Sequence, residues 1–167
     1  MRDEIVNRVA NSVLITFDLE DFYVPGDRVK VDLSQWLDQG FVLREKEFRT
    51  AITSFDWSIY KDCYVALFCS TDAILPAWAS LLITAQLNPV TKQIVWGSLQ
   101  DLEYQIFAKA IDELDLSSFE SKPVIVKGCS EKRIPESAFV YLIQKLQPVV
   151  KSLFYGEACS SVPLFKK

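Results

Sequence analysis

Residues 64–68 read Tyr-Val-Ala-Leu-Phe, a short continuous apolar run that fits a β-strand covered on both faces. The chain after this run alternates helical patterns with further strand patterns. Helical patterns lie over 75–87, over 99–114 and from residue 135 to an expected end at Gly156, and strand patterns lie at 93–96 and 123–126. Such alternation is typical of right-handed crossovers between parallel strands. It predicts an α/β fold, a three-layer open sheet with parallel βαβ units in residues 62–155.

The first sixty residues follow a less regular pattern. Strand patterns lie at 13–17 and 29–31, and helical patterns lie at 32–39 and 44–55. We expect residues 1–60 to form a smaller α+β portion that packs on or extends the sheet, and residues 61–167 to form the parallel βαβ core with a C-terminal tail. The length of 167 residues fits a single domain, and we find no internal repeat and no low-complexity linker.

The composition excludes several classes of function. The chain has no histidine, which excludes Ser-His-Asp and Cys-His catalysis, histidine bases and metal sites that need imidazole. It also has no nucleotide-binding motif of the GxGxxG or P-loop type. No apolar run reaches the roughly 18 residues of a membrane span, and the first residues lack the apolar core of a signal peptide. We therefore expect a cytoplasmic protein without a membrane partner, and we predict no catalytic residue.

The charge is distributed unevenly along the chain. The net charge is −4, which does not favour a nucleic-acid partner. Residues 1–120 carry 10 basic and 19 acidic side chains, whereas residues 121–167 carry 8 basic and 3 acidic ones. This asymmetry is typical of a basic docking face, for which Lys127, Lys132 and Arg133 are the candidates. Alternatively, the two parts face each other within one domain and neutralise each other.

Three of the four cysteines are followed by serine, namely Cys69, Cys129 and Cys159. Cys69 ends the first predicted parallel strand and Cys129 follows the third. Since the carboxyl ends of parallel strands form the crevice where ligands bind, we expect these two thiols at one sheet edge. Cys159 joins them if the tail folds back across the domain, and we predict that residues 157–167 are ordered and do so. Cys63, at the start of its strand, is predicted to be structural.

Three converging thiols would form a site for a soft metal. Thiolates select zinc or an iron–sulphur cluster over magnesium or calcium, and the nearby cations would favour the thiolate form. Asp72 or Glu157 could supply a fourth ligand, or the position could stay open for an external one. Two alternatives remain: the cysteines are structural, since free cysteine is a common buried residue, or a single thiol carries out redox or sulphur-transfer chemistry.

Several stretches resemble a known family. They read DEIVNRV (3–9), TFDLEDFY (16–23), CSTDAI (69–74), VKGCS (126–130) and YGEACSSVPL (155–164). Together they resemble the uncharacterised bacterial family named domain of unknown function 2480, over essentially the whole chain. The resemblance implies a single-domain protein and transfers no activity and no catalytic residue. Genes of this family often neighbour the SUF system for iron–sulphur cluster assembly, which implies iron–sulphur assembly proteins as partners.

Residues and resemblance together predict an accessory protein of iron–sulphur cluster assembly or trafficking. In this hypothesis Cys69, Cys129 and Cys159 bind a metal ion or an iron–sulphur cluster. One alternative is a metal-free protein-interaction module of the same pathway that docks through its basic C-terminal third. Another is a sulphur carrier in which Cys129 or Cys159 forms a persulfide.

Overall fold

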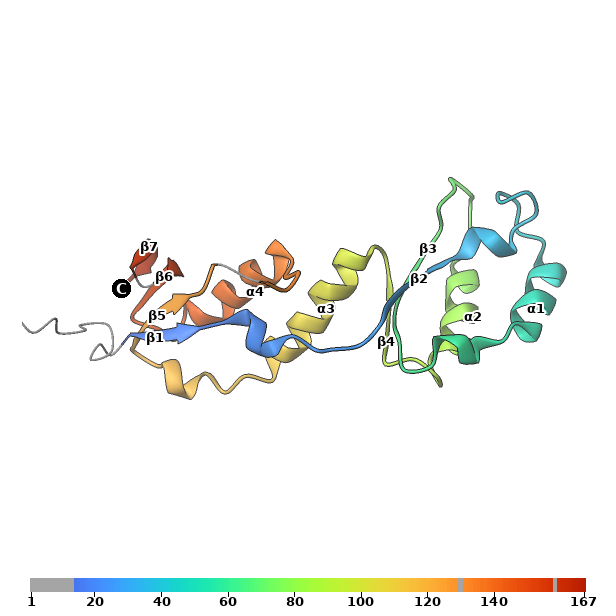
Figure 1. The fold of residues 1–167 in the computed structure, drawn as a ribbon. Helices are drawn as coiled ribbons and strands as arrows, with labels where there is room; N and C mark the ends of the chain where they lie inside the picture. The colour runs from blue at the N-terminus through green and yellow to red at the C-terminus, as the bar shows by residue number, and fades with distance from the viewer. Residues whose placement is uncertain (1–13, 129–130, 158) are drawn as a thin grey trace, which may run out of the picture. The chain divides into compact units, whose positions relative to one another are not determined.

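The computed structural model describes residues 14–128, 131–157 and 159–167 (Figure 1). These residues form two sheets and four α-helices, which confirms the predicted α/β class. The chain divides into two units. Unit 1 combines the N-terminal segment up to Tyr23 with Ile106–Lys167, and unit 2 is Val24–Gln105. None of the described helices is long and apolar enough to cross a membrane.

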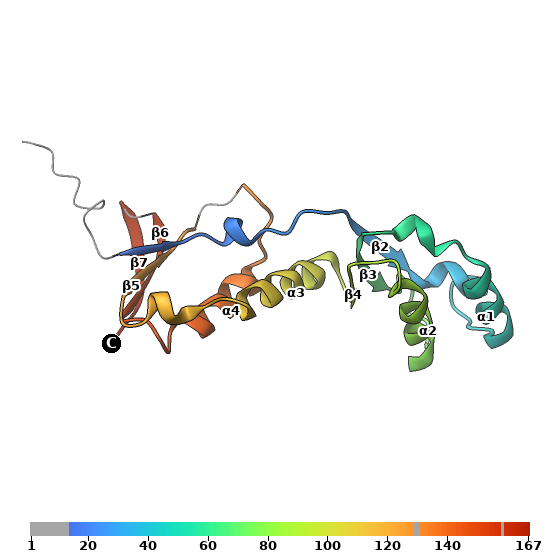
Figure 2. The ribbon, with the colours of Figure 1, turned by 90° about the horizontal axis from the view of Figure 1, so that it is seen from below.

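Unit 1 contains a four-stranded sheet in the order β1-β5-β6-β7. Its strands are β1 (Ile15–Phe17), β5 (Pro123–Val126), β6 (Ser152–Glu157) and β7 (Ser160–Lys166). The first three are parallel, whereas β7 pairs with β6 in the antiparallel sense. The strands of this sheet lie together in both views (Figure 1, Figure 2). Helix α4 (Glu136–Leu146) connects β5 to β6, and the boundary between the units falls inside α3 (Leu99–Asp112). Buried side chains of the sheet, α3 and α4 form one core, which includes Phe17, Phe107, Val124, Leu142 and Leu153.

Unit 2 contains a three-stranded parallel sheet in the order β2-β3-β4. Its strands are β2 (Arg28–Asp32), β3 (Tyr64–Phe68) and β4 (Gln93–Trp96), and its helices are α1 (Glu45–Ser54) and α2 (Ala77–Leu87). Strand β3 is central and almost wholly buried, as its continuous apolar run predicts. A second core, which includes Val31, Phe48, Val65, Ile83 and Leu87, fills this unit.

The prediction of one continuous sheet is wrong. Strands β3 and β4 belong to the sheet of unit 2, whereas β5 belongs to the sheet of unit 1. Strands β1 and β2, from the first sixty residues, join the sheets of units 1 and 2, respectively. An apolar run shows that a strand is covered on both faces but does not say which strand lies beside it. That the chain is a single domain stays a prediction.

The helix predicted from residue 135 to Gly156 is also shorter than expected. It ends at Leu146, and residues 152–157 form strand β6 instead. Pro148 explains the end, because proline cannot donate a backbone hydrogen bond and its ring clashes with the preceding turn. The apolar residues after Pro148 keep a spacing that a short strand also satisfies.

The two units repeat one another, so the sequence analysis was wrong to find no repeat. Each unit has a strand, an Asp-capped 3-10 helix, an α-helix, a second Asp-capped 3-10 helix, a central strand, an α-helix and a further strand. Unit 2 runs β2, α1, β3, α2, β4, and unit 1 runs β1, α3, β5, α4, β6. The strand orders β2-β3-β4 and β1-β5-β6 correspond as well.

The repeat extends to individual residues at a constant sequence offset. Residues 86–97 read QLNPVTKQIVWG and residues 145–156 read KLQPVVKSLFYG. The left-handed residues Asp62 and Ser121 correspond, with φ angles of 59° and 56°. Their N–H groups donate to the corresponding carbonyls of Val90 and Val149, at 2.8 and 2.9 Å. Residues of the two units that share this offset are called corresponding residues below.

Candidate functional site

The cysteines that the sequence analysis singles out belong to different parts of the chain. Cys69 follows β3 in unit 2, whereas Cys159 lies between β6 and β7 in unit 1. Cys129 lies outside the described residues. Because β3 and β5 belong to different sheets, the shared-edge argument for Cys69 and Cys129 is wrong. In the sequence one Cys-Ser dipeptide follows the central strand of each unit, but the offset of the repeat pairs Cys129 with Ser70 and not with Cys69. A site formed by all three thiols stays a prediction.

The described tail after Gly156 forms regular structure. That the tail brings Cys159 to Cys69 and Cys129 stays a prediction. Residues 152–157 run parallel to β5 with Val126 opposite Tyr155, so the ends of β5 and β6 lie at one edge. The chain then turns at Cys159 into β7. Cys159 is exposed and not in a disulfide. Within the described ranges, no three His, Cys, Asp or Glu side chains are placed to hold a metal ion.

The carboxyl edge of the unit 1 sheet is charged and internally paired. Lys127 Nζ donates to Asp18 Oδ2 at 2.6 Å, and the carboxylate of Glu20 accepts the N–H groups of Glu131 and Lys132. Burial raises the pKa of Asp18, but hydrogen bonds from Lys127 and from the backbone N–H of Glu20, with the Lys127 charge, leave it below its ordinary value. The bond to Asp18 in turn raises the pKa of Lys127. Lys127, a predicted docking residue, is therefore engaged within its own unit.

Other groups at this edge are also packed. Lys132 Nζ lies 5.4 Å from the centre of the Tyr23 ring, and Tyr155 Oη donates to the carbonyl of Gly128 at 3.3 Å. A Cβ atom at Gly128 would lie 2.9 Å from Tyr155 Cζ, so any larger residue would force this ring to shift. Arg133, the third predicted docking residue, is exposed.

The carboxyl edge of the unit 2 sheet begins with a polar network. Asp32 accepts the N–H groups of Ser34 and Ser70, both at 3.0 Å. Burial raises the pKa of Asp32, but the hydrogen bonds from Ser70 and Ser34 outweigh it and lower the pKa. The half-buried Cys69 has its Sγ 3.4 Å from Thr71 Oγ1, and this hydroxyl donates to the carbonyl of Gly40 at 2.6 Å. This network ties the strand end to the loop before α1.

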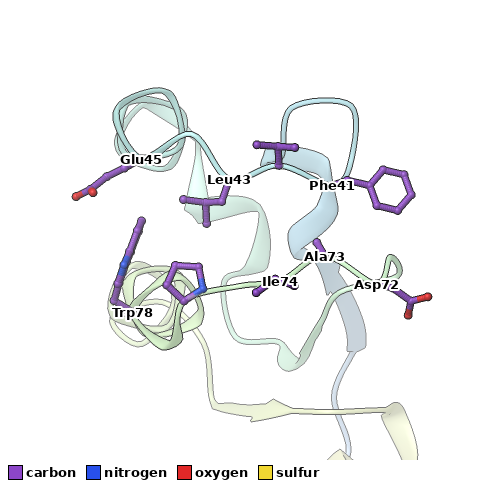
Figure 3. Close-up of a pocket in the computed structure, with 9 residues that line it drawn as sticks. Phe41, Leu43, Glu45, Asp72, Ala73, Ile74 and Trp78 are labelled. Carbon is purple, nitrogen blue, oxygen red and sulfur yellow. The ribbon is translucent and has the colours of Figure 1, made fainter.

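An apolar pocket of about 530 Å³ lies next to this network, between the loop before α1 and the loop before α2 (Figure 3). Its lining residues are Phe41, Val42, Leu43, Glu45, Asp72, Ala73, Ile74, Pro76 and Trp78. Seven of these nine are apolar, and both charged ones are acidic. Figure 3 shows Leu43, Ile74 and Trp78 between Glu45 at one end and Asp72 at the other. Its volume is in the range of ligand pockets.

The pocket rim exposes side chains that soluble proteins usually bury. Ile74 is 96% exposed, Phe41 58% and Val42 52%. Leaving an isoleucine in water forgoes about 1.5–3 kcal/mol of the stabilisation that its burial would give. An exposed group of this kind beside a pocket marks a binding surface. The candidate functional site is therefore this pocket in unit 2.

The sequence profile of a protein family matches residues 3–167; the family is described as "Protein of unknown function (DUF2480)". The chain belongs to this family. The match confirms the resemblance noted from the sequence. No curated protein and no solved structure matches the chain.

In this DUF2480 chain, the predicted ligands Asp72 and Glu157 lie in different units. Asp72 lines the pocket of unit 2, and Glu157 ends β6 in unit 1. Sequence reasoning did not single out Phe41 or Ile74, because an apolar side chain near a helix start is ordinarily assigned to the core. A signal was present: Ile74 stands between Asp72 and Pro76, in a connection too polar and too short to be a strand.

Proposed function

We propose that the chain is a protein-interaction module whose unit 2 binds an apolar segment of a partner protein in the pocket. The observation that carries this proposal is the exposure of Ile74 at the pocket rim, at 96%. The repeat supports a functional reason for this residue, because the corresponding residue of unit 1 is the exposed Arg133. The fold therefore does not require an apolar side chain at this position. Trp78 likewise corresponds to Ser137.

A random peptide library displayed on phage tests the proposal. Selection on the full chain is expected to enrich peptides with an apolar centre, and Ile74→Asp is expected to abolish their binding. Leu81→Asp is the matched control, because Leu81 is 65% exposed on α2 and does not line the pocket. It should leave binding unchanged. Failure to enrich any peptide that depends on Ile74 would contradict the proposal.

The sequence-based hypothesis of a thiol site remains a second candidate. The observation in its favour is that β5 and β6, each followed by a Cys-Ser dipeptide, end side by side in parallel register. Cys159 is exposed and thus accessible to a metal or to a sulphur donor. In this candidate Cys129 and Cys159 hold zinc or an iron–sulphur cluster, with Glu157 or an external ligand completing the site. A ligand that also used Cys69 would have to join the two units.

Metal content per chain tests this second candidate. Protein purified without oxygen is expected to contain zinc, or iron with the visible absorption of a cluster, and Cys159→Ser should lower the amount. The control is Cys63→Ser, since Cys63 is 7% exposed and lies directly before β3. Metal-free wild-type protein would rule out the site. A persulfide on Cys159 in such protein, detected by mass spectrometry, would favour the sulphur carrier. Iron–sulphur assembly proteins as partners and a cytoplasmic location stay predictions.

A further inference from the structure

We infer that the segment bound in the pocket is an extended apolar peptide flanked on both sides by lysine or arginine; this inference rests on the proposed function. The chemistry of the partner is inferred from the groups that line the pocket. Three properties carry it: the charges at the two ends, the apolar surface between them, and the unpaired backbone of one wall.

The charges at the ends of the pocket are both negative. Glu45 and Asp72 stand at opposite ends of the row of apolar side chains (Figure 3). Glu45 accepts a bond from Arg49 Nε at 2.9 Å, but both side chains are more than half exposed, so this pair is weak. Arg44, which precedes Glu45, is bonded to Asp38 at 2.7 Å. Asp72 is exposed and forms no ion pair within the described residues. A bound segment with a cation at each end would complement both carboxylates.

The surface between the two carboxylates is apolar. Leu43, Ile74 and Trp78 lie along it, and Phe41 borders the Asp72 end (Figure 3). Aliphatic side chains of a partner would bury Ile74, and their burial would be the main favourable contribution to binding. The flanking charges would then set orientation and selectivity rather than most of the affinity.

One wall of the pocket offers a free peptide backbone. In the described part of the chain, the backbone groups of Ala73, Ile74 and Leu75 form no hydrogen bond with another residue. Pro76 ends this segment, and α2 begins at Ala77. An extended peptide can pair with such a segment through its own backbone, whereas a helix has already paired its interior groups. The bound segment is therefore expected to be extended.

The peptide selection described above tests this inference when it is repeated on two doubly substituted full-length chains. In peptides selected on wild type, lysine and arginine should be enriched on both sides of the apolar centre. The variant Glu45→Gln with Asp72→Asn should select apolar peptides without this enrichment. It should also bind a wild-type-selected peptide about fivefold more weakly, the loss expected for two exposed ion pairs. The control variant Glu47→Gln with Asp62→Asn removes two exposed carboxylates outside the pocket and should retain the enrichment.

The outcomes separate this inference from the proposed function. Ile74-dependent peptides without basic flanks would overturn the inference and leave the apolar docking site standing. The absence of Ile74-dependent peptides would overturn both. A concentration-dependent dimer that Ile74→Asp abolishes, measured by light scattering, would show that a second copy of the chain fills the pocket, which also overturns the inference.

Discussion

The loop before α4 in unit 1 and the loop before α2 in unit 2 occupy the same place in a repeated fold, yet their surfaces differ. Both follow a central parallel strand and both lead into a helix with proline at its N-cap. In unit 1 residues 131–133 of this loop read Glu-Lys-Arg, whereas the corresponding stretch of unit 2 reads Asp-Ala-Ile at 72–74. The fold thus fixes where the loop lies and leaves its chemistry free.

The strand ends beside these loops also share their position in the fold but differ in their chemistry. Asp18 and Asp32 each follow or end a strand and each cap a 3-10 helix through a side-chain oxygen. Asp18 also pairs with Lys127 across the edge of unit 1, whereas Asp32 accepts the N–H of Ser70 in unit 2. The two units therefore share one arrangement, but the carboxyl edge of unit 1 is charged whereas that of unit 2 has an apolar surface. We interpret the apolar copy as the binding site.

The largest effect is expected from truncating corresponding core residues. Ile83 on α2 and Leu142 on α4 are both fully buried, each in the core of its own unit. Ile83→Ala and Leu142→Ala should each destabilise their own unit by about 2–5 kcal/mol, through lost burial and the cavity left behind. Hydrogen exchange should show the loss of protection mainly in the substituted unit. Equal loss in both units for either variant would show that the two cores unfold together and would break the comparison.

Exchanging the side chains at the two corresponding loop positions should change binding but hardly affect stability. Ile74→Arg gives unit 2 the residue of unit 1 and should weaken binding of a selected peptide more than tenfold, because the apolar contact is lost. Its unfolding free energy should change by less than about 0.5 kcal/mol, since the residue is exposed. Fluorescence polarisation and urea unfolding measure the two quantities.

The reverse exchange is the control. Arg133→Ile should not create a second binding site, because unit 1 has Ser137 where unit 2 has Trp78. Peptide binding that persists in Ile74→Arg would place the site elsewhere.

A smaller effect is expected at the crowded edge of unit 1. Gly128→Ala places a methyl group 2.9 Å from Tyr155 Cζ, so the ring must shift and its bond to the Gly128 carbonyl is strained. We expect a loss of about 1 kcal/mol, at the lower end of overpacking costs because a tyrosine ring end can move. Tyr155→Leu should relieve most of this loss in the double variant. Urea unfolding of the four proteins measures it, and additive losses would contradict the contact.

The smallest expected effect is on acid stability. The folded-state pKa values of Asp18 and Asp32 are lowered, so the stability that these groups contribute is present above their ordinary pKa. This stability is lost as the pH falls from the ordinary pKa through the lowered pKa of the folded state. Lys127→Met removes a partner that lowers the pKa of Asp18, so the stability that unit 1 loses on acidification should become smaller. Asp18→Asn should remove the contribution of this group altogether. An unchanged pH profile in Lys127→Met would contradict the assigned cause.

Much of the local structure could be predicted from the sequence. The apolar runs at β3, β4 and β5 and the helical patterns of α2 and α3 were identified correctly, because each element buries residues at its own period. The distribution of strands between two sheets could not be predicted, because the sequence of a buried parallel strand does not indicate which strand pairs with it. Strand β6 was mistaken for helix, because Leu153 continues the helical spacing of Leu142, Leu146 and Val149.

The candidate site was missed for a related reason. The Cys-Ser dipeptides favoured a thiol site, but in the sequence Cys69 follows the central strand of unit 2 and Cys129 that of unit 1. The repeat itself is hard to see because few residues are identical beyond the stretch around Pro89 and Pro148. The exposure of Ile74 depends on where the loops before α1 and α2 lie in space, which periodicity does not encode.

The backbone amide resonances of the full chain, titrated with a selected peptide, test most directly whether the pocket is the docking site. The account predicts that chemical-shift changes concentrate at residues 41–45 and 72–78. It also predicts that Ile74→Arg removes these changes. Changes centred on residues 131–133, with residues 41–45 and 72–78 unaffected, would assign docking to the basic loop of unit 1 and contradict the account.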